Sequence, residues 1–165
     1  MRQIVYALIA LTAMAACTSI DCPVQNLVYT NYAMMKANGV ADTLDTDTLW
    51  ILTRRADGTD TALVNGLTGN GVTSFSLQIS HNQPEDVFVL DYHCYGDGGT
   101  YKDTFRIKKE DIPHFESVDC QAAYFHVINS VTTTHHVLDS IVIKYPKVNY
   151  DVTRTHYYIY FKADR

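Results

Sequence analysis

Histidine and aspartate side chains are the groups in this chain that could bind a metal ion. The sequence has seven histidines, of which His93 shares a strand face with Asp91, while His135 and His136 precede Asp139 in an expected loop. A zinc site needs three or four converging ligands, usually signalled by C-x-x-C or H-x-x-x-H spacing, and neither occurs. Adjacent histidines also point apart in a strand. We therefore predict no zinc site.

Several aspartates precede the expected strand 49–52 or lie around a glycine turn, so a calcium site is the second metal site to consider. They are Asp42, Asp45, Asp47, Asp57 and Asp60. An EF-hand loop requires D-x-[DN]-x-[DN]-G with a glutamate at its twelfth position, and the chain has neither. Because such aspartates commonly form solvated turns, we predict no metal and no cofactor.

Catalytic motifs are also missing from the sequence. There is no G-x-S-x-G elbow. Cys94 follows His93 directly, but neighbouring strand residues face opposite sides of a sheet and cannot form a nucleophile–base pair. Carboxylates are numerous enough for a glycosidase, although nothing points to a particular pair. We predict a non-enzyme, with a hydrolase or metal-binding protein as the third alternative.

The first seventeen residues have the layout of a secretory signal. Arg2 is followed by an apolar run over residues 4–13 and then by Met14-Ala15-Ala16-Cys17. The run is too short to cross a bilayer comfortably, since that takes about 20 residues. The step into Cys17 resembles the lipobox of bacterial lipoproteins, which implies diacylglycerol on the Cys17 sulfur, cleavage before it and acylation (palmitate) of the new amino terminus. An ordinary signal peptide cut elsewhere is the alternative.

Residues 17–23 would then form a lipidated tether, and the residues that follow Cys17 bear on location. Thr18, rather than aspartate, comes next, which in lipoproteins favours passage to the outer membrane. Asp21 is the only acidic residue nearby, so we expect the periplasm-facing leaflet rather than the cell surface. The net charge of −5, with no cluster of lysine or arginine beyond a pair, argues against nucleic acid as a partner.

The remainder of the chain shows a hydrophobic period of two and no convincing helical period. The alternation is clearest in residues 73–80, 86–95 and 101–108. Connections are expected at 38–48 and at 109–114, and Pro113 closes the second of them. We predict an all-β fold: an antiparallel, immunoglobulin-like β-sandwich of eight or nine strands, forming a single domain over residues 24–165. A closed barrel is the alternative.

Several segments of the chain carry a family resemblance: the steps 117–120 and 134–141, Pro146-Lys147-Val148, the aromatic final strand and an early cysteine like Cys22. In these segments the chain resembles a group of small lipoproteins of Bacteroidetes with no assigned function. Gln121 departs from the pattern, which has glycine after Cys120. The resemblance implies an envelope location and a β fold, and it implies no activity.

Three cysteines remain if Cys17 carries lipid, and an exported protein can join two of them. Cys94 is in phase with apolar residues and reads as a buried side chain. Cys22 and Cys120 lie beside polar residues at strand beginnings, and both belong to the family pattern. We therefore expect Cys22–Cys120, with Cys94–Cys120 as the rival pairing.

Twelve tyrosines suggest a binding surface, because aromatic rings give a large contact area at low entropy cost. In the final strand, Tyr158 and Tyr160 alternate with Tyr157, Ile159 and Phe161, so Tyr158 and Tyr160 are the candidate partner-binding residues. Aromatic pairing across strands is the structural alternative. We predict an envelope lipoprotein that binds an unknown envelope protein or glycan, or serves a structural role. A surface-exposed adhesive or glycan-binding module is the runner-up.

Overall fold

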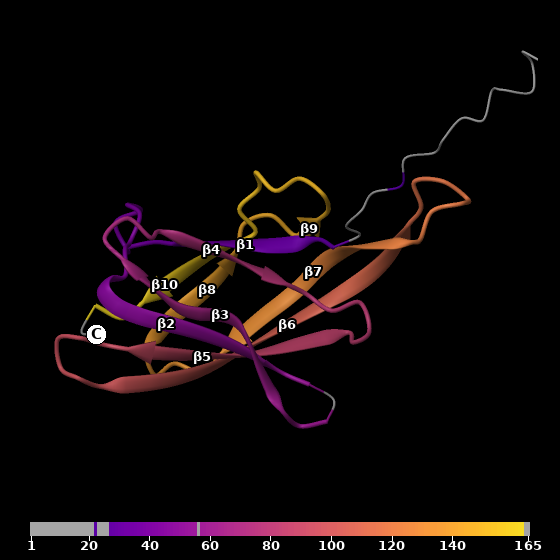
Figure 1. Cartoon of the computed structure of the whole chain (residues 1–165). Helices are drawn as coiled ribbons and strands as arrows, with labels where there is room; N and C mark the ends of the chain where they lie inside the picture. Colours follow the sequence, from indigo (N-terminus) through magenta and orange to yellow (C-terminus); the bar gives the residue numbers. More distant parts are fainter. Residues whose placement is uncertain (1–21, 23–26, 56, 164–165) are drawn as a thin grey trace, which may run out of the picture.

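The computed structural model describes residues 22, 27–55 and 57–163, which contain ten strands (Figure 1). In chain order the strands are β1 (Tyr29–Met34), β2 (Asp45–Arg54), β3 (Asp60–Gly69), β4 (Ser74–Gln78), β5 (Glu85–His93), β6 (Thr100–His114), β7 (Ala123–Thr133), β8 (Leu138–Ile143), β9 (Lys147–Val148) and β10 (Tyr157–Phe161). None of the described segments is a helix of the length and apolar character that crossing a membrane requires. The predicted cleavage site before Cys17 lies outside the described residues.

The strands form two sheets, which confirms the predicted β-sandwich. One sheet has the order β4-β1-β10-β8 and the other β3-β2-β5-β6-β7-β9. The closed-barrel alternative is wrong, because the strands separate into two sheets. The prediction of an antiparallel fold needs one correction: β1 and β10 are parallel, with Tyr32 opposite Tyr157. The structure also has ten strands rather than eight or nine, since the two-residue β9 gives no signal in the sequence.

Aromatic rings from both sheets fill the space between them. Tyr32 of β1 stacks on Tyr157 of β10 at a centroid distance of 4.7 Å and meets Phe105 of β6 edge-on at 6.1 Å. Tyr92 of β5 contacts Phe161 of β10 at 5.2 Å. All five side chains are buried, so the core is the aromatic layer between the two sheets.

The period-two pattern predicted the inward faces of the central strands. Phe75, Leu77 and Ile79 are buried along and just after β4, and the even-numbered residues 86–94 are buried along β5. β5 and β6 form the predicted hairpin, with Tyr92 opposite Tyr101. The predicted turn at Asp57-Gly58 is also present, and Gly58 has the positive φ of 82° that favours glycine.

Two predicted connections are wrong. β2 already begins at Asp45, within the expected connection 38–48. β6 continues through the expected connection 109–114 and ends only at His114. Pro113 does not stop it, because β5 reaches only as far as Lys108, and beyond that point β6 pairs with β7 alone. Proline is tolerated on such an edge, where one row of N–H groups has no partner strand.

Candidate functional site

The cysteines are arranged as the sequence suggested. Cys22 and Cys120 form a disulfide with Cα atoms 5.5 Å apart, and Cys94 is a free, buried thiol. The rival pairing Cys94–Cys120 is therefore wrong. The bond closes a sequence separation of 98 residues, which corresponds to about 5 kcal/mol of stabilisation in the chain-entropy model. Cys17 lies outside the described residues.

Tyr158 and Tyr160 lie on the outer face of the four-stranded sheet, opposite the buried Tyr157, Ile159 and Phe161. Both are half-buried rather than fully exposed. The ammonium group of Lys144 sits 4.8 Å from the Tyr158 ring centroid, so this ring already has a neighbour within the chain. The two tyrosines share a face, as the alternation predicted.

The residues weighed for zinc are held by other partners. His93 Nε2 lies 3.3 Å from Asp91 Oδ1, but Lys102 Nζ lies 3.1 Å from the second oxygen of Asp91. His135 Nδ1 contacts the backbone carbonyl of Asp139 at 2.8 Å. His136 turns instead toward a different residue, Asp103, so the adjacent histidines diverge as expected.

The aspartates weighed for calcium mainly organise their own turns. Asp57 accepts hydrogen bonds from the backbone and hydroxyl of Thr59, and Asp60 pairs with Arg54 at 3.0 Å. Asp47 accepts from the Tyr92 hydroxyl. Within the described ranges, no three histidine, cysteine, aspartate or glutamate side chains are grouped so that they could hold a metal ion.

A chain of four charged or titratable side chains crosses three strands of the larger sheet, and sequence analysis did not identify it. This ionic chain consists of Asp86 on β5, Lys109 and Asp111 on β6, and His126 on β7. Lys109 Nζ lies 3.6 Å from Asp86 Oδ2 and 2.8 Å from Asp111 Oδ1. Asp111 Oδ1 in turn lies 2.6 Å from His126 Nδ1. The Lys109 side chain is completely buried, so its charge is compensated only within the protein.

Strand periodicity explains how Lys109 comes to face inward. Phe105, Ile107 and Lys109 are all buried, and they occupy successive inward positions of β6. The expectation of a connection starting at Lys109 hid this series. If the alternation is continued past Ile107, Lys109 and Asp111 are the next two residues on the core face. A buried lysine needs a partner of opposite charge, and Asp111 supplies it.

The ionic chain also fixes the crossing from β4 to β5, which links the two sheets. The Ser80 backbone N–H donates to Asp86 Oδ1 at 3.2 Å, and Lys109 Nζ donates to the Gln83 carbonyl at 2.7 Å. The Lys109 backbone N–H donates to the Pro84 carbonyl at 3.0 Å. Lys109 therefore holds this loop through both its buried ammonium group and its backbone N–H.

Burial changes the protonation of both ends of the ionic chain. It raises the pKa of Asp86 to about 6, against the opposing attraction of the Lys109 charge. Burial also lowers the pKa of His126, an effect that the hydrogen bond to Asp111 opposes. Asp86 can therefore exchange a proton near neutral pH, although Ser80 and Lys109 occupy its oxygens.

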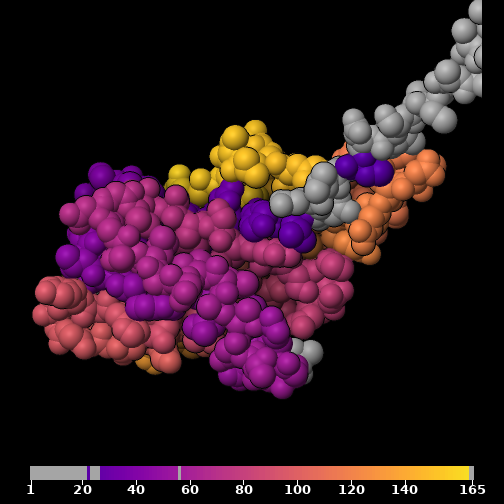
Figure 2. Space-filling model, viewed as in Figure 1, coloured from indigo at the N-terminus to yellow at the C-terminus, as the bar shows by residue number. Residues whose placement is uncertain are grey.

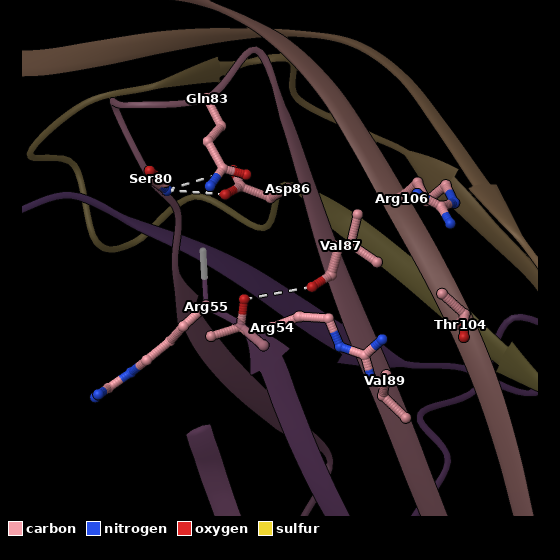
Figure 3. A pocket seen from close by; sticks show the side chains of 10 residues that line it. Arg54, Arg55, Ser80, Gln83, Asp86, Val87, Val89, Thr104 and Arg106 are labelled. Atoms are coloured by element: carbon pink, nitrogen blue, oxygen red, sulfur yellow. Dashed lines mark hydrogen bonds between the residues drawn. The ribbon is translucent and has the colours of Figure 1, made fainter. Parts of the chain in front are cut away.

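A surface depression of about 640 Å³ is bordered by Asp86 near the start of β5 and by side chains on the outer face of the larger sheet (Figure 3). Its lining comprises Thr53, Arg54, Arg55, Ser80, Gln83, Asp86, Val87, Val89, Thr104 and Arg106. Figure 3 shows the side chains of Val87, Val89 and Thr104 projecting from two neighbouring strands. These strands are β5 and β6, where Val87 pairs with Arg106 and Val89 with Thr104.

The arginines of the depression are partly neutralised. Arg54 pairs with Asp60 at 3.0 Å, and Arg106 Nη1 contacts Glu85 Oε1 at 3.2 Å. A guanidinium group has five N–H donors, more than either pairing uses. The depression can therefore offer hydrogen-bond donors beside an apolar floor, which suits the carbonyl, hydroxyl or carboxylate groups of a bound partner.

Comparison with known proteins yields a family and no relative of established function. Residues 48–161 match the model of a family of unknown function, DUF6452. The match covers β2 from Thr48 onward and all the later strands, and so includes the ionic chain and the depression. The search of curated proteins finds no match, and neither does the search of solved structures.

Proposed function

We propose that this chain, which belongs to the family of unknown function DUF6452, is a lipid-anchored module of a bacterial envelope. In this proposal Cys17 carries the lipid, including palmitate, and the β-sandwich faces the periplasm from the outer membrane. Its role is to bind an envelope protein or glycan, or to serve as a structural element, rather than to catalyse a reaction.

The disulfide between Cys22 and Cys120 is the observation that carries the proposal. Stable disulfides belong mainly to oxidising compartments such as the periplasm, and the pairing therefore supports export. It also ties the sandwich to a point only five residues after Cys17 in the sequence. An exported domain with so short a link to a lipobox-like cysteine fits a membrane anchor.

Two surfaces support binding over catalysis. The depression bordered by Asp86 combines partly paired arginines with valine side chains, a mixture that suits recognition of a polar group. Tyr158 and Tyr160 provide an aromatic surface on the opposite sheet. Most of the acidic side chains considered for chemistry serve turns or ion pairs within the chain, which leaves them little freedom to react.

Lipid attachment is tested by growing cells that express the full-length chain with an alkyne analogue of palmitate. We expect the label on the wild-type protein and its loss in Cys17→Ser, together with a shift from the membrane to the soluble fraction. Cys94→Ser is the matched control, because it removes a buried thiol that carries no proposed lipid. Label that persists in Cys17→Ser contradicts the proposal.

The two sides of the membrane are distinguished by protease treatment of intact cells. A periplasm-facing module resists digestion until the outer membrane is opened, whereas the surface-exposed adhesive or glycan-binding alternative is cleaved at once. Affinity capture from solubilised membranes then identifies the partner. We expect the double variant Tyr158→Ala/Tyr160→Ala to lose it, and unchanged capture contradicts the assignment of these tyrosines.

A further inference from the structure

Three exposed apolar side chains gather where β6 returns into β7. This β6–β7 tip, residues 112–120, carries Ile112, Phe115 and Val118, which are 44%, 63% and 98% exposed. Aliphatic and aromatic groups so exposed on a short turn are typical of a contact surface rather than of a folding core.

The β6–β7 tip stands away from the rest of the sandwich. Beyond Lys108 on β6 and before His126 on β7, the two strands pair only with each other, since β5 and β9 end there. Figure 1 shows this orange hairpin extending past the other labelled strands, and Figure 2 shows its end as a protruding knob. The tip can therefore meet a flat surface before the body of the protein does.

The β6–β7 tip is also held in a defined shape. The Cys120 backbone N–H donates to the Ser117 carbonyl at 3.2 Å and closes the turn that carries Val118. The His114 ring stacks on Phe125 with centroids 4.2 Å apart, and the disulfide secures Cys120 to Cys22. The exposed side chains thus project from a braced turn.

The position of Cys22 identifies what the β6–β7 tip meets. Cys22 is the fifth residue after Cys17, and five residues span at most about 18 Å even when fully extended. Because the disulfide joins Cys22 to Cys120, this distance also limits how far the tip can lie from Cys17. If Cys17 is lipidated, as the proposed function holds, the tip is the described part of the protein that is tied closest to the bilayer.

We propose that the β6–β7 tip rests in the polar headgroup region of the membrane that holds the anchor, with Phe115 and Val118 dipping toward the acyl chains. This inference rests on the proposed function, because the lipid supplies the nearness. The aromatic and aliphatic side chains suit the interface, where apolar burial adds to anchoring. Several acyl chains on Cys17 would already retain the protein, so the role of this second contact is to orient the domain on the membrane.

The charges of the β6–β7 tip specify the kind of lipid. Glu116 and Asp119 flank the apolar residues, and of these Glu116 is paired with His114 at 3.0 Å. Two carboxylates beside the contact disfavour an anionic surface. The occupant we infer is therefore a zwitterionic phospholipid surface, and the test uses vesicles of phosphatidylcholine.

Tryptophan fluorescence tests the inference on the full-length lipidated chain. The sequence has one tryptophan, Trp50, so Trp50→Phe gives a silent background for Val118→Trp at the tip. Tyr95→Trp is the matched control, because Tyr95 is 78% exposed and precedes β6, whose 15 residues span about 50 Å. Vesicles with brominated acyl chains quench an indole that reaches them, and co-flotation with the vesicles reports the anchor.

We expect Val118→Trp to shift its emission to the blue and to be quenched severalfold more than Tyr95→Trp. Phe115→Trp repeats the measurement should the first variant fold poorly. Equal quenching at both ends of a protein that floats overturns the inference and leaves the proposed function standing. The emission of Val118→Trp is also measured without vesicles in a protein that carries Cys17→Ser. A blue shift there overturns the inference as well, because a second copy of the chain then covers the tip. A chain that carries no lipid overturns the proposed function and this inference together.

Discussion

Asp103 and Asp86 are both buried carboxylates, and each secures a crossing between the two sheets by a different chemistry. Asp103 on β6 holds the crossing from β7 to β8, and Asp86 on β5 holds the crossing from β4 to β5. Asp103 is 1% exposed and Asp86 6%. Both carboxylates are thus almost out of contact with solvent, and they differ in the partners that surround them.

Asp103 is surrounded by donors that are mostly uncharged. Its Oδ2 accepts from the backbone N–H groups of Val137 and Leu138 at 2.8 and 2.7 Å. Its Oδ1 accepts from the Thr134 hydroxyl at 2.6 Å and the His136 N–H at 2.9 Å. Burial would raise its pKa, but these hydrogen bonds to the ionised form outweigh burial and lower it.

Asp86 has fewer and longer contacts. One backbone N–H, that of Ser80, is shared between its two oxygens at 3.2 and 3.3 Å, and Lys109 Nζ lies 3.6 Å away. Burial therefore prevails and the pKa rises to about 6. Several short hydrogen bonds therefore keep Asp103 ionised, whereas one shared N–H and an ammonium group at 3.6 Å do not offset the burial of Asp86.

The largest expected effect comes from Asp103→Asn. An amide keeps only one acceptor oxygen, so its NH2 group must face one of the two donor pairs, either the N–H groups of Val137 and Leu138 or the donors to Oδ1, at a cost of about 4 kcal/mol. Urea unfolding at pH 7 measures it. Asp139→Asn is the control on the same segment, because Asp139 is exposed, and it should stay close to the wild type. A loss in Asp103→Asn no larger than that of the control contradicts the role given to Asp103.

Asp86→Asn should change the pH dependence of stability. The folded protein binds the Asp86 proton more tightly than the unfolded chain does, since the pKa rises from 3.8 to about 6. The contribution of Asp86 to the free energy of unfolding is therefore largest below pH 4, and it is lost as the pH rises through 6. The stability of Asp86→Asn relative to the wild type should increase by about 2 kcal/mol between pH 4 and pH 7.

Unfolding curves for both proteins at several pH values measure this difference. The lowered pKa values of His126 and His156 affect both proteins and largely cancel in the comparison. Asp103 contributes in another window, because its stabilisation is present above pH 4 and is lost only at lower pH. A difference that stays flat from pH 4 to 7 contradicts the account of Asp86.

The smallest effect is expected from Thr134→Val, which removes one hydroxyl donor to Asp103 and keeps the shape of the side chain. The remaining donors still hold the carboxylate, so we expect a loss of about 1 kcal/mol. The acid limb of the stability curve should also move to higher pH, as the pKa of Asp103 rises toward its ordinary value. An unchanged acid limb would show that the backbone donors alone set that pKa.

Local periodicity predicted the parts of this fold in which one face is apolar. Residues 74–78 and 86–92 alternate cleanly, and their buried faces follow from the sequence. The parallel pairing of β1 with β10 could not be predicted, because the two strands lie far apart in the sequence. The hydrogen bond from Asn31 N–H to His156 Nδ1 is one contact between these distant segments. Pattern reasoning does not determine which distant strands become neighbours.

The candidate site was harder to predict than the fold. The ionic chain draws its members from β5, β6 and β7, and each member alone resembles an ordinary polar surface residue. In the sequence, Pro113 indicates a connection over residues 109–114, and Lys109 and Asp111 fall within it. The disulfide was predictable because few cysteines limited the choices, whereas the depression depends on the register between β5 and β6.

Mass spectrometry of the mature protein from membranes tests whether Cys17 carries a lipid anchor beside the disulfide-secured tip. We predict an amino terminus at Cys17 that carries diacylglycerol and an acyl chain, in a molecule in which Cys22 and Cys120 are linked. An amino terminus at another residue, or an unmodified Cys17, contradicts the proposed lipid anchor.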